Sequence, residues 1–123
     1  MKKLFLVSLM MLAGSAWAEW VMLFEGVSAT HYLNPATIRK DGNLRRVWGI
    51  SDLIERDEFG AQSRRVRYEY DCKKERYRHL EVSLHSEFMA GGKILHRING
   101  DTTWMEIPPD TAVESALNIV CAK

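Results

Sequence analysis

Side chains alternate between apolar and charged along the segment from Ser63 to Cys72. The apolar parity consists of Val66, Tyr68, Tyr70 and Cys72. The charged parity consists of Arg65, Arg67, Glu69 and Asp71. Alternation with a period of two over this length predicts a half-buried strand. Cys72 therefore belongs to the apolar face of that strand.

Five further segments have the features of strands: residues 20–24, 30–33, 44–54, 76–86 and 93–98. In the third, Leu44, Trp48, Ile50 and Ile54 share a parity and are expected to be its apolar side. We expect residues 34–35 to stop the second strand and residues 35–38 to form one helical turn, because Pro35 restricts the residue before it. Residues 104–107 are expected to be a short extended piece.

A helix is predicted near the C-terminus, over residues 112–121. Its apolar stripe, with helical spacing, consists of Val113, Ala116, Leu117, Val120 and Cys121. Thr111 is a good N-cap, and Glu114 three residues later completes a capping box. A bond between Cys72 and Cys121 would fasten the apolar side of this helix to the apolar side of the sheet. The residues thus predict an α+β fold.

The first 18 residues have the pattern of a signal peptide. Lys2 and Lys3 precede an apolar run over residues 4–12, and Ala16-Trp17-Ala18 is a small-x-small cleavage site. We expect export to the periplasm or beyond, with residues 19–123 as one domain. No cysteine lies directly after the apolar run, so we expect no lipid anchor, and no other stretch is long enough to span a membrane.

Removing Lys2 and Lys3 from the 17 basic residues leaves 15, against 16 acidic ones. A net charge near −1 argues against bulk binding to nucleic acid or membranes. The only two cysteines, Cys72 and Cys121, favour a disulfide in an oxidising compartment. Metal ligation and a redox pair are the alternatives, although no C-x-x-C motif is present.

No pattern marks a catalytic site, a cofactor or a metal centre. The histidines, His31, His79, His85 and His96, lack the i, i+4 helical spacing of metal ligands. No G-x-S-x-G motif is present, and Gly91-Gly92-Lys93 lacks the remainder of a phosphate-binding loop. We therefore expect no enzymatic activity.

Basic residues gather on the hairpin predicted from residues 63–72 and 76–86. They are Arg64, Arg65, Arg67, Lys73, Lys74, Arg76 and Arg78. Antiparallel pairing would bring several of them together as a site for an anionic partner, such as a glycan, an acidic protein segment or a lipid head group. The alternative is a solvated face, balanced by the interleaved acids Glu69, Asp71, Glu75 and Glu81.

Several stretches, in order, carry a family resemblance. They are residues 31–43, 46–48, 68–72, 76–78 and 89–92, Trp104 with residues 107–109, and Cys121. Together they resemble the surface-adhesin protein E family of Gram-negative bacteria. The resemblance implies a six-stranded antiparallel β-sheet, with a C-terminal α-helix packed on its concave face and tethered by a disulfide. It also implies dimers, and a binding role.

The leading hypothesis is an exported, non-catalytic, adhesin-like binding module. It would contact a protein or an anionic polymer through the surface or an edge of its sheet. The alternative is a periplasmic small-ligand carrier that uses the space between sheet and helix. Trp48, Tyr68 and Tyr70 would line that space.

Overall fold

The structure is a computed structural model that describes residues 19–122, so the predicted signal peptide lies outside the described residues. Seven strands, one short 3-10 segment and one α-helix follow each other along the chain. They are β1 (Val21–Glu25), β2 (Ala29–Asp41), β3 (Leu44–Leu53), β4 (Ser63–Asp71), β5 (Arg76–Glu87), η4 (Phe88–Ala90), β6 (Gly91–Asn99), β7 (Met105–Glu106) and α1 (Ala112–Val120).

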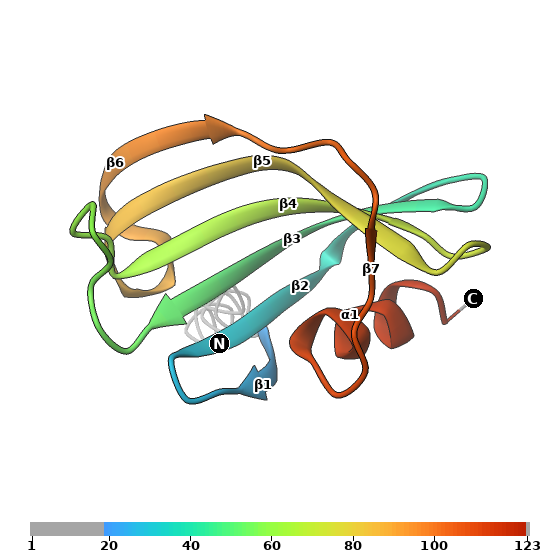
Figure 1. Cartoon of the computed structure of the whole chain (residues 1–123), viewed down its shortest axis with the longest axis horizontal. Coiled ribbons are helices and arrows are strands. Elements are labelled where there is room, and N and C mark those ends of the chain that lie inside the picture. The colour runs from blue at the N-terminus through green and yellow to red at the C-terminus, as the bar shows by residue number, and fades with distance from the viewer. Residues whose placement is uncertain (1–18, 123) are drawn as a thin grey trace, which may run out of the picture.

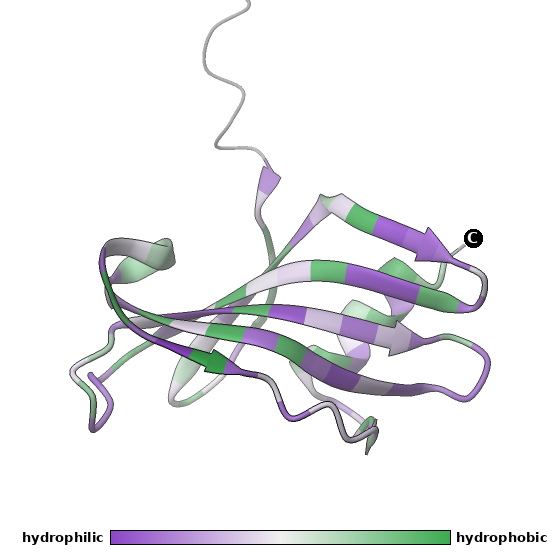
Figure 2. Ribbon diagram, turned by 90° about the horizontal axis from the view of Figure 1, so that it is seen from above, coloured by the Kyte–Doolittle hydropathy of each residue, from purple (hydrophilic) through white to green (hydrophobic). Residues whose placement is uncertain are grey.

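Strands β1 to β6 form one sheet in sequence order, each antiparallel to the next (Figure 1). The two-residue strand β7 pairs with Arg76 and Tyr77, at the start of β5, whereas β6 pairs with residues 81–87 of β5. Figure 2 shows hydrophilic and hydrophobic residues alternating along the strands. The predicted α+β fold is confirmed, and the extended piece expected at residues 104–107 is a seventh, very short strand.

The expectation that Pro35 ends the second strand is wrong, because β2 continues through it to Asp41. The pairing with β3 is interrupted between Asn34 and Arg39, so the ring of Pro35 and its missing N–H fall within an irregularity. The Thr37 hydroxyl donates to the Asn34 carbonyl at 2.7 Å and accepts from the Trp48 N–H at 3.0 Å. These side-chain bonds replace part of the interrupted backbone ladder.

The core lies between α1 and one face of the sheet. Leu33, Val47 and Tyr70 of the sheet pack with Ala116 and Val120 of the helix, and each is at most 3 % exposed. The apolar parity predicted for β4 is confirmed by the burial of Tyr70. For β3, the prediction that the side bearing Trp48 is the apolar side is wrong where the strand faces the helix. Val47 faces α1, since it pairs with Tyr68, and the neighbouring Trp48 lies on the other face.

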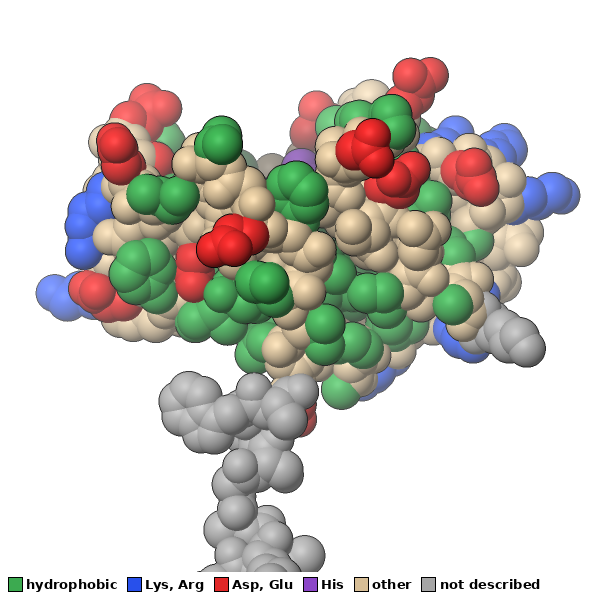
Figure 3. Space-filling view, turned by 90° about the horizontal axis from the view of Figure 1, so that it is seen from below, with side chains coloured by type: hydrophobic (Ala, Val, Ile, Leu, Met, Phe, Trp, Pro, Cys, Tyr) green, Lys and Arg blue, Asp and Glu red, His purple; other side chains and the backbone are tan. Residues whose placement is uncertain are grey.

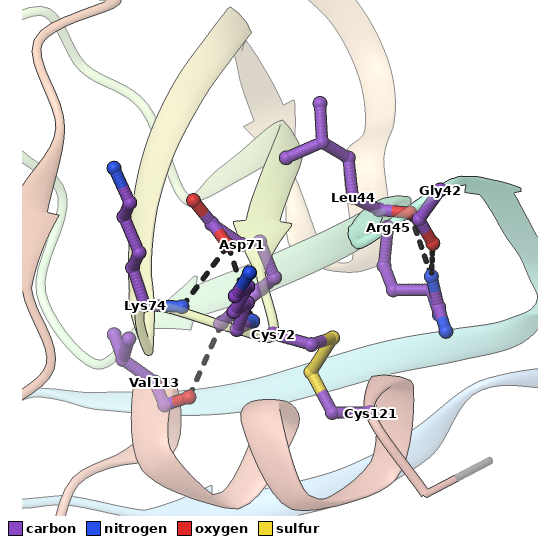
Figure 4. The surroundings of a disulfide bond; sticks show 10 residues. Gly42, Leu44, Arg45, Asp71, Cys72, Lys74, Val113 and Cys121 are labelled. Atoms are coloured by element: carbon purple, nitrogen blue, oxygen red, sulfur yellow. Dashed lines mark hydrogen bonds between the residues drawn. A yellow bond between two sulfur atoms is a disulfide. The ribbon is translucent and has the colours of Figure 1, made fainter.

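The helix is fastened at both ends. Thr111 is the N-cap and accepts from the Glu114 N–H, as predicted, but the Glu114 carboxylate accepts from the N–H of Asp110 rather than that of Thr111. At the other end Cys121 follows the last turn and is bonded to Cys72, which follows β4 (Figure 4). The predicted disulfide is therefore confirmed. It closes a loop whose ends are 49 residues apart.

Candidate functional site

The face of the sheet opposite α1 carries most of the arginine side chains of β3 and β4. Strand alternation places Arg65, Arg67 and Glu69 there, because Val66, Tyr68 and Tyr70 point toward the helix side. The antiparallel register then sets their neighbours across the strands. The rows that result are Arg46–Glu69–Arg78, Trp48–Arg67–Glu81 and Arg65–Ser83–Arg97.

A buried carboxylate lies on this face near the end of β4. Glu69 has a side chain only 1 % exposed, and it accepts from Arg46 Nε at 2.8 Å and from Arg78 Nε and Nη2 at 2.8 and 2.6 Å. Burial raises the pKa of Glu69, but the hydrogen bonds and charges of the two arginines outweigh it and hold that pKa below its usual value. Glu69 therefore orders both guanidinium groups on the sheet.

Trp48 holds a second pair of arginines. The guanidinium of Arg65 lies 4.3 Å from the centre of the Trp48 ring, and that of Arg67 lies 6.0 Å from it. Arg67 also approaches Glu81 at 3.5 Å, in an exposed pair. Such an exposed ion pair contributes little stability. The guanidinium groups of Arg65 and Arg67 are thus placed by an aromatic ring.

Trp104 is arranged in the same way near the other end of β5. The guanidinium groups of Arg76 and Arg78 lie 4.4 and 4.2 Å from the centre of its ring. Arg76 also donates to Asp71 at 3.1 Å, whose other carboxylate oxygen accepts from the backbone of the β4–β5 turn. Arg76 and Arg78 are therefore both bonded to a buried or nearly buried carboxylate.

Two hollows flank Trp48 on this face. One has a volume of about 140 Å³ and is lined by Arg65 and Arg97 together with Glu81, Ser83 and Asn99. The other has a volume of about 190 Å³ and is lined by Thr37 and the arginines Arg39, Arg46 and Arg67. We call the five arginines of the two hollows the arginine stripe: Arg39, Arg46, Arg65, Arg67 and Arg97.

The predicted basic cluster does not form one patch. Arg65 and Arg67 belong to the arginine stripe, and Arg76 and Arg78 flank Trp104. Arg64 lies on the other face, 3.7 Å from Asp57. Lys73 and Lys74 are exposed in the β4–β5 turn. They lie six or more residues from Arg67, or roughly 20 Å along an extended chain.

Sequence reasoning missed Arg39, Arg46 and Arg97 of the stripe. Their strands lie far from β4 in the chain, and only the register brings them to the same face. Alternation along β3 was the available signal for Arg46, but the wrong parity was assigned to that strand. The alternative of a solvated, balanced face does not hold for Glu69, which is buried.

The space between the sheet and α1 is filled by side chains. Tyr68, Tyr70 and Tyr77 pack ring to ring, with centroid distances of 5.9–6.3 Å. The Tyr70 hydroxyl donates to the carbonyl of Val113 at 3.2 Å. Burial raises the pKa of Tyr68 to about 12. A cavity of about 20 Å³ remains beneath the helix, room for one water molecule at most.

The predicted carrier site is therefore wrong. Trp48 lies on the opposite face of the sheet from Tyr68 and Tyr70, and no space of ligand size separates the tyrosines from the helix.

Seen from below, the molecule presents hydrophobic and acidic side chains over its middle, with Lys and Arg mainly toward its two ends (Figure 3).

One hydroxyl–imidazole pair has the distance of a nucleophile and its base. Ser83 Oγ lies 2.8 Å from His85 Nε2, but both residues are buried. His85 Nδ1 has no hydrogen-bond partner among the described residues, so the group that would orient the imidazole is missing. Burial, then the charges of Arg65 and Arg97, lower the pKa of His85. The pair fits a structural role.

Within residues 19–122, no group of His, Cys, Asp or Glu side chains is arranged to hold a metal ion. The same part of the chain contains no helix with the length and apolar character needed to cross a membrane. The fold and this face together define a small α+β domain with a tethered helix and an arginine-rich sheet surface.

The family model described as surface-adhesin protein E matches residues 20–122, and the chain belongs to that family. It is accordingly an adhesin-like protein, exported or displayed at the cell surface. No curated protein matches the chain.

Solved structures of protein E from Haemophilus influenzae share this fold. Crystal form II aligns with a TM-score of 0.65 and 18% identity, over 85% of this chain and 88% of that chain. The selenomethionine form aligns with a TM-score of 0.67 and 17% identity, over 85% and 87%. Protein E from a non-typeable strain aligns with a TM-score of 0.60 and 19% identity, over 85% of this chain and 76% of that chain.

Proposed function

We propose that the protein is an exported, non-catalytic binding module that holds an anionic polymer against the arginine stripe. The observation that carries the proposal is the placement of five guanidinium groups around Trp48, in two hollows on one face. Arginine is suited to this use because its planar donors match carboxylate, sulfate and phosphate groups. The family's adhesin character agrees with a surface that binds a large partner.

Two of the five arginines of the stripe, Arg46 and Arg67, pair with carboxylates, and both side chains remain partly exposed. Arg46 shares Glu69 with Arg78, yet its side chain remains 42 % exposed. Arg67 faces Glu81 only through a weak exposed contact. Arg39 donates to the carbonyl groups of Ala36 and Ile38, and its charge is not paired by them. A polymer with several anionic groups can therefore contact several arginines at once.

The test measures binding to immobilised dextran sulfate, with neutral dextran as the reference surface. We expect saturable binding to the sulfated polymer only, and weaker binding as salt rises. Arg65→Gln should weaken it severalfold. Arg64→Gln is the matched control, because it removes the same charge from the adjacent residue on the other face, and it should change binding by less than about twofold.

Far-UV circular dichroism and thermal melting of each variant check that the fold is retained. If Arg65→Gln perturbs the packing on Trp48, Arg67→Gln supplies the same test from a guanidinium that lies farther from that ring, at 6.0 Å. Equal losses for the Arg64 and Arg65 variants would mean that overall charge, not the stripe, governs binding. That result, or no binding to dextran sulfate, would overturn the proposal.

A further inference from the structure

The two hollows beside Trp48 do not present a uniform positive charge. Arg39, Arg46 and Arg67 line one, and Arg65 and Arg97 line the other. Glu81 is the cross-strand partner of Arg67, which lines the first hollow, and Glu81 itself helps to line the second. Its side chain is 52 % exposed, so a bound molecule can reach the carboxylate. An acceptor therefore stands within a row of donors.

The distance along the stripe is large enough for an extended chain. Arg39 belongs to β2 and Arg97 to β6, so the stripe crosses four strand spacings, or roughly 19 Å. A polymer lying across the strands from β2 to β6 would meet basic groups and Trp48 first, then the arginines of β4, then Glu81 on β5, and last Arg97 on β6. Asn99, an exposed amide, adds a neutral donor and acceptor at the far hollow.

The aromatic rings of this face already contact arginines, which would compete with stacked bases. The guanidinium of Arg65 covers Trp48, and those of Arg76 and Arg78 lie over Trp104. Single-stranded nucleic acids are held by free aromatic faces together with a continuous basic groove. A uniform polyphosphate would also place negative charge beside Glu81, which is unfavourable. The face therefore disfavours a phosphodiester polymer.

We infer that the arginine stripe takes an acidic polysaccharide, whose anionic groups are separated by carbon atoms that bear hydroxyls. The inference rests on the proposed function and names its ligand class. Carboxylate or sulfate groups of the glycan occupy the two hollows. A sugar hydroxyl between them donates to the Glu81 carboxylate, which a polymer without hydroxyls cannot do.

The experiment compares chondroitin sulfate with inorganic polyphosphate, using the native protein, Glu81→Ala and Glu106→Ala. Glu106 is the matched control, because it is an exposed glutamate on β7, outside both hollows. We expect Glu81→Ala to bind chondroitin sulfate roughly tenfold more weakly, as the loss of a hydrogen bond to a charged group implies. The same variant should bind polyphosphate severalfold more tightly, because a repulsive charge is gone.

Glu106→Ala should change both affinities by less than twofold. Opposite signs for the two polymers with Glu81→Ala, and no such split with Glu106→Ala, would support the inference. If Glu81→Ala tightens both polymers or leaves both unchanged, the ligand class is wrong, while the anion-binding function stands. If the native protein binds neither polymer and also fails to bind dextran sulfate, both proposals fall.

Discussion

Replacing Glu69 by glutamine tests whether the buried carboxylate holds the arginine face together. The substitution keeps the size of the side chain and removes its charge. Three hydrogen bonds from Arg46 and Arg78 lose their charged acceptor, and the new amide N–H₂ faces donors. Breaking a buried ion pair costs roughly 3–5 kcal/mol. The two arginines are 42 % and 28 % exposed, so water compensates them in part. We expect a loss of about 2–3 kcal/mol at pH 7.

The pH dependence of this loss gives a second, sharper readout. The pKa of Glu69 is lowered by folding, so its charged form stabilises the native state. That contribution is present above the usual glutamate pKa of about 4.5, and it disappears as the pH falls through the lower pKa of the folded state. The stability difference between the native protein and Glu69→Gln should therefore be constant near neutral pH and shrink in acid.

Urea unfolding followed by tryptophan fluorescence, at several pH values, measures both quantities. Glu81→Gln is the control, because that side chain is 52 % exposed and its ion pair is long, and it should cost less than about 0.5 kcal/mol. A Glu69→Gln variant as stable as the native protein at pH 7 would refute the assigned role. So would a stability difference that does not shrink at low pH.

Three further predictions concern the helix and its packing on the sheet. We expect Cys72→Ser and Cys121→Ser each to lower the free energy of unfolding by about 4 kcal/mol, because the disulfide closes a loop whose ends are 49 residues apart. Thermal melting with and without reductant checks this, and an unchanged melting midpoint would contradict it. Gly49→Ala should lower the free energy of unfolding, measured in urea, by about 1–3 kcal/mol, because the added carbon would lie 2.9 Å from the ring of Tyr68. An unchanged stability would show that the ring moves aside freely. Tyr70→Phe should cost about 1 kcal/mol by removing a bond to a helix carbonyl, and no loss would mean that the bond contributes nothing.

Residue patterns along the chain determined the fold class and its covalent link. The alternation around Tyr70 and the helical stripe that contains Val120 are local periodicities, which depend on backbone geometry alone. They placed Cys72 and Cys121 on apolar faces, and these faces meet in the structure. The capping residue Thr111 was likewise readable, since a cap depends only on its immediate neighbours.

The arginine face required the tertiary structure. Glu69, Arg46 and Arg78 meet because three strands pair in one particular register, and a shift of one residue would send each side chain to the other face. The continuation of β2 through Pro35 has a related reason: the irregularity around it lies in the pairing with β3, where the Trp48 N–H donates to the Thr37 hydroxyl. Local periodicity determines which side chains can share a face, whereas only long-range pairing decides which of them become neighbours.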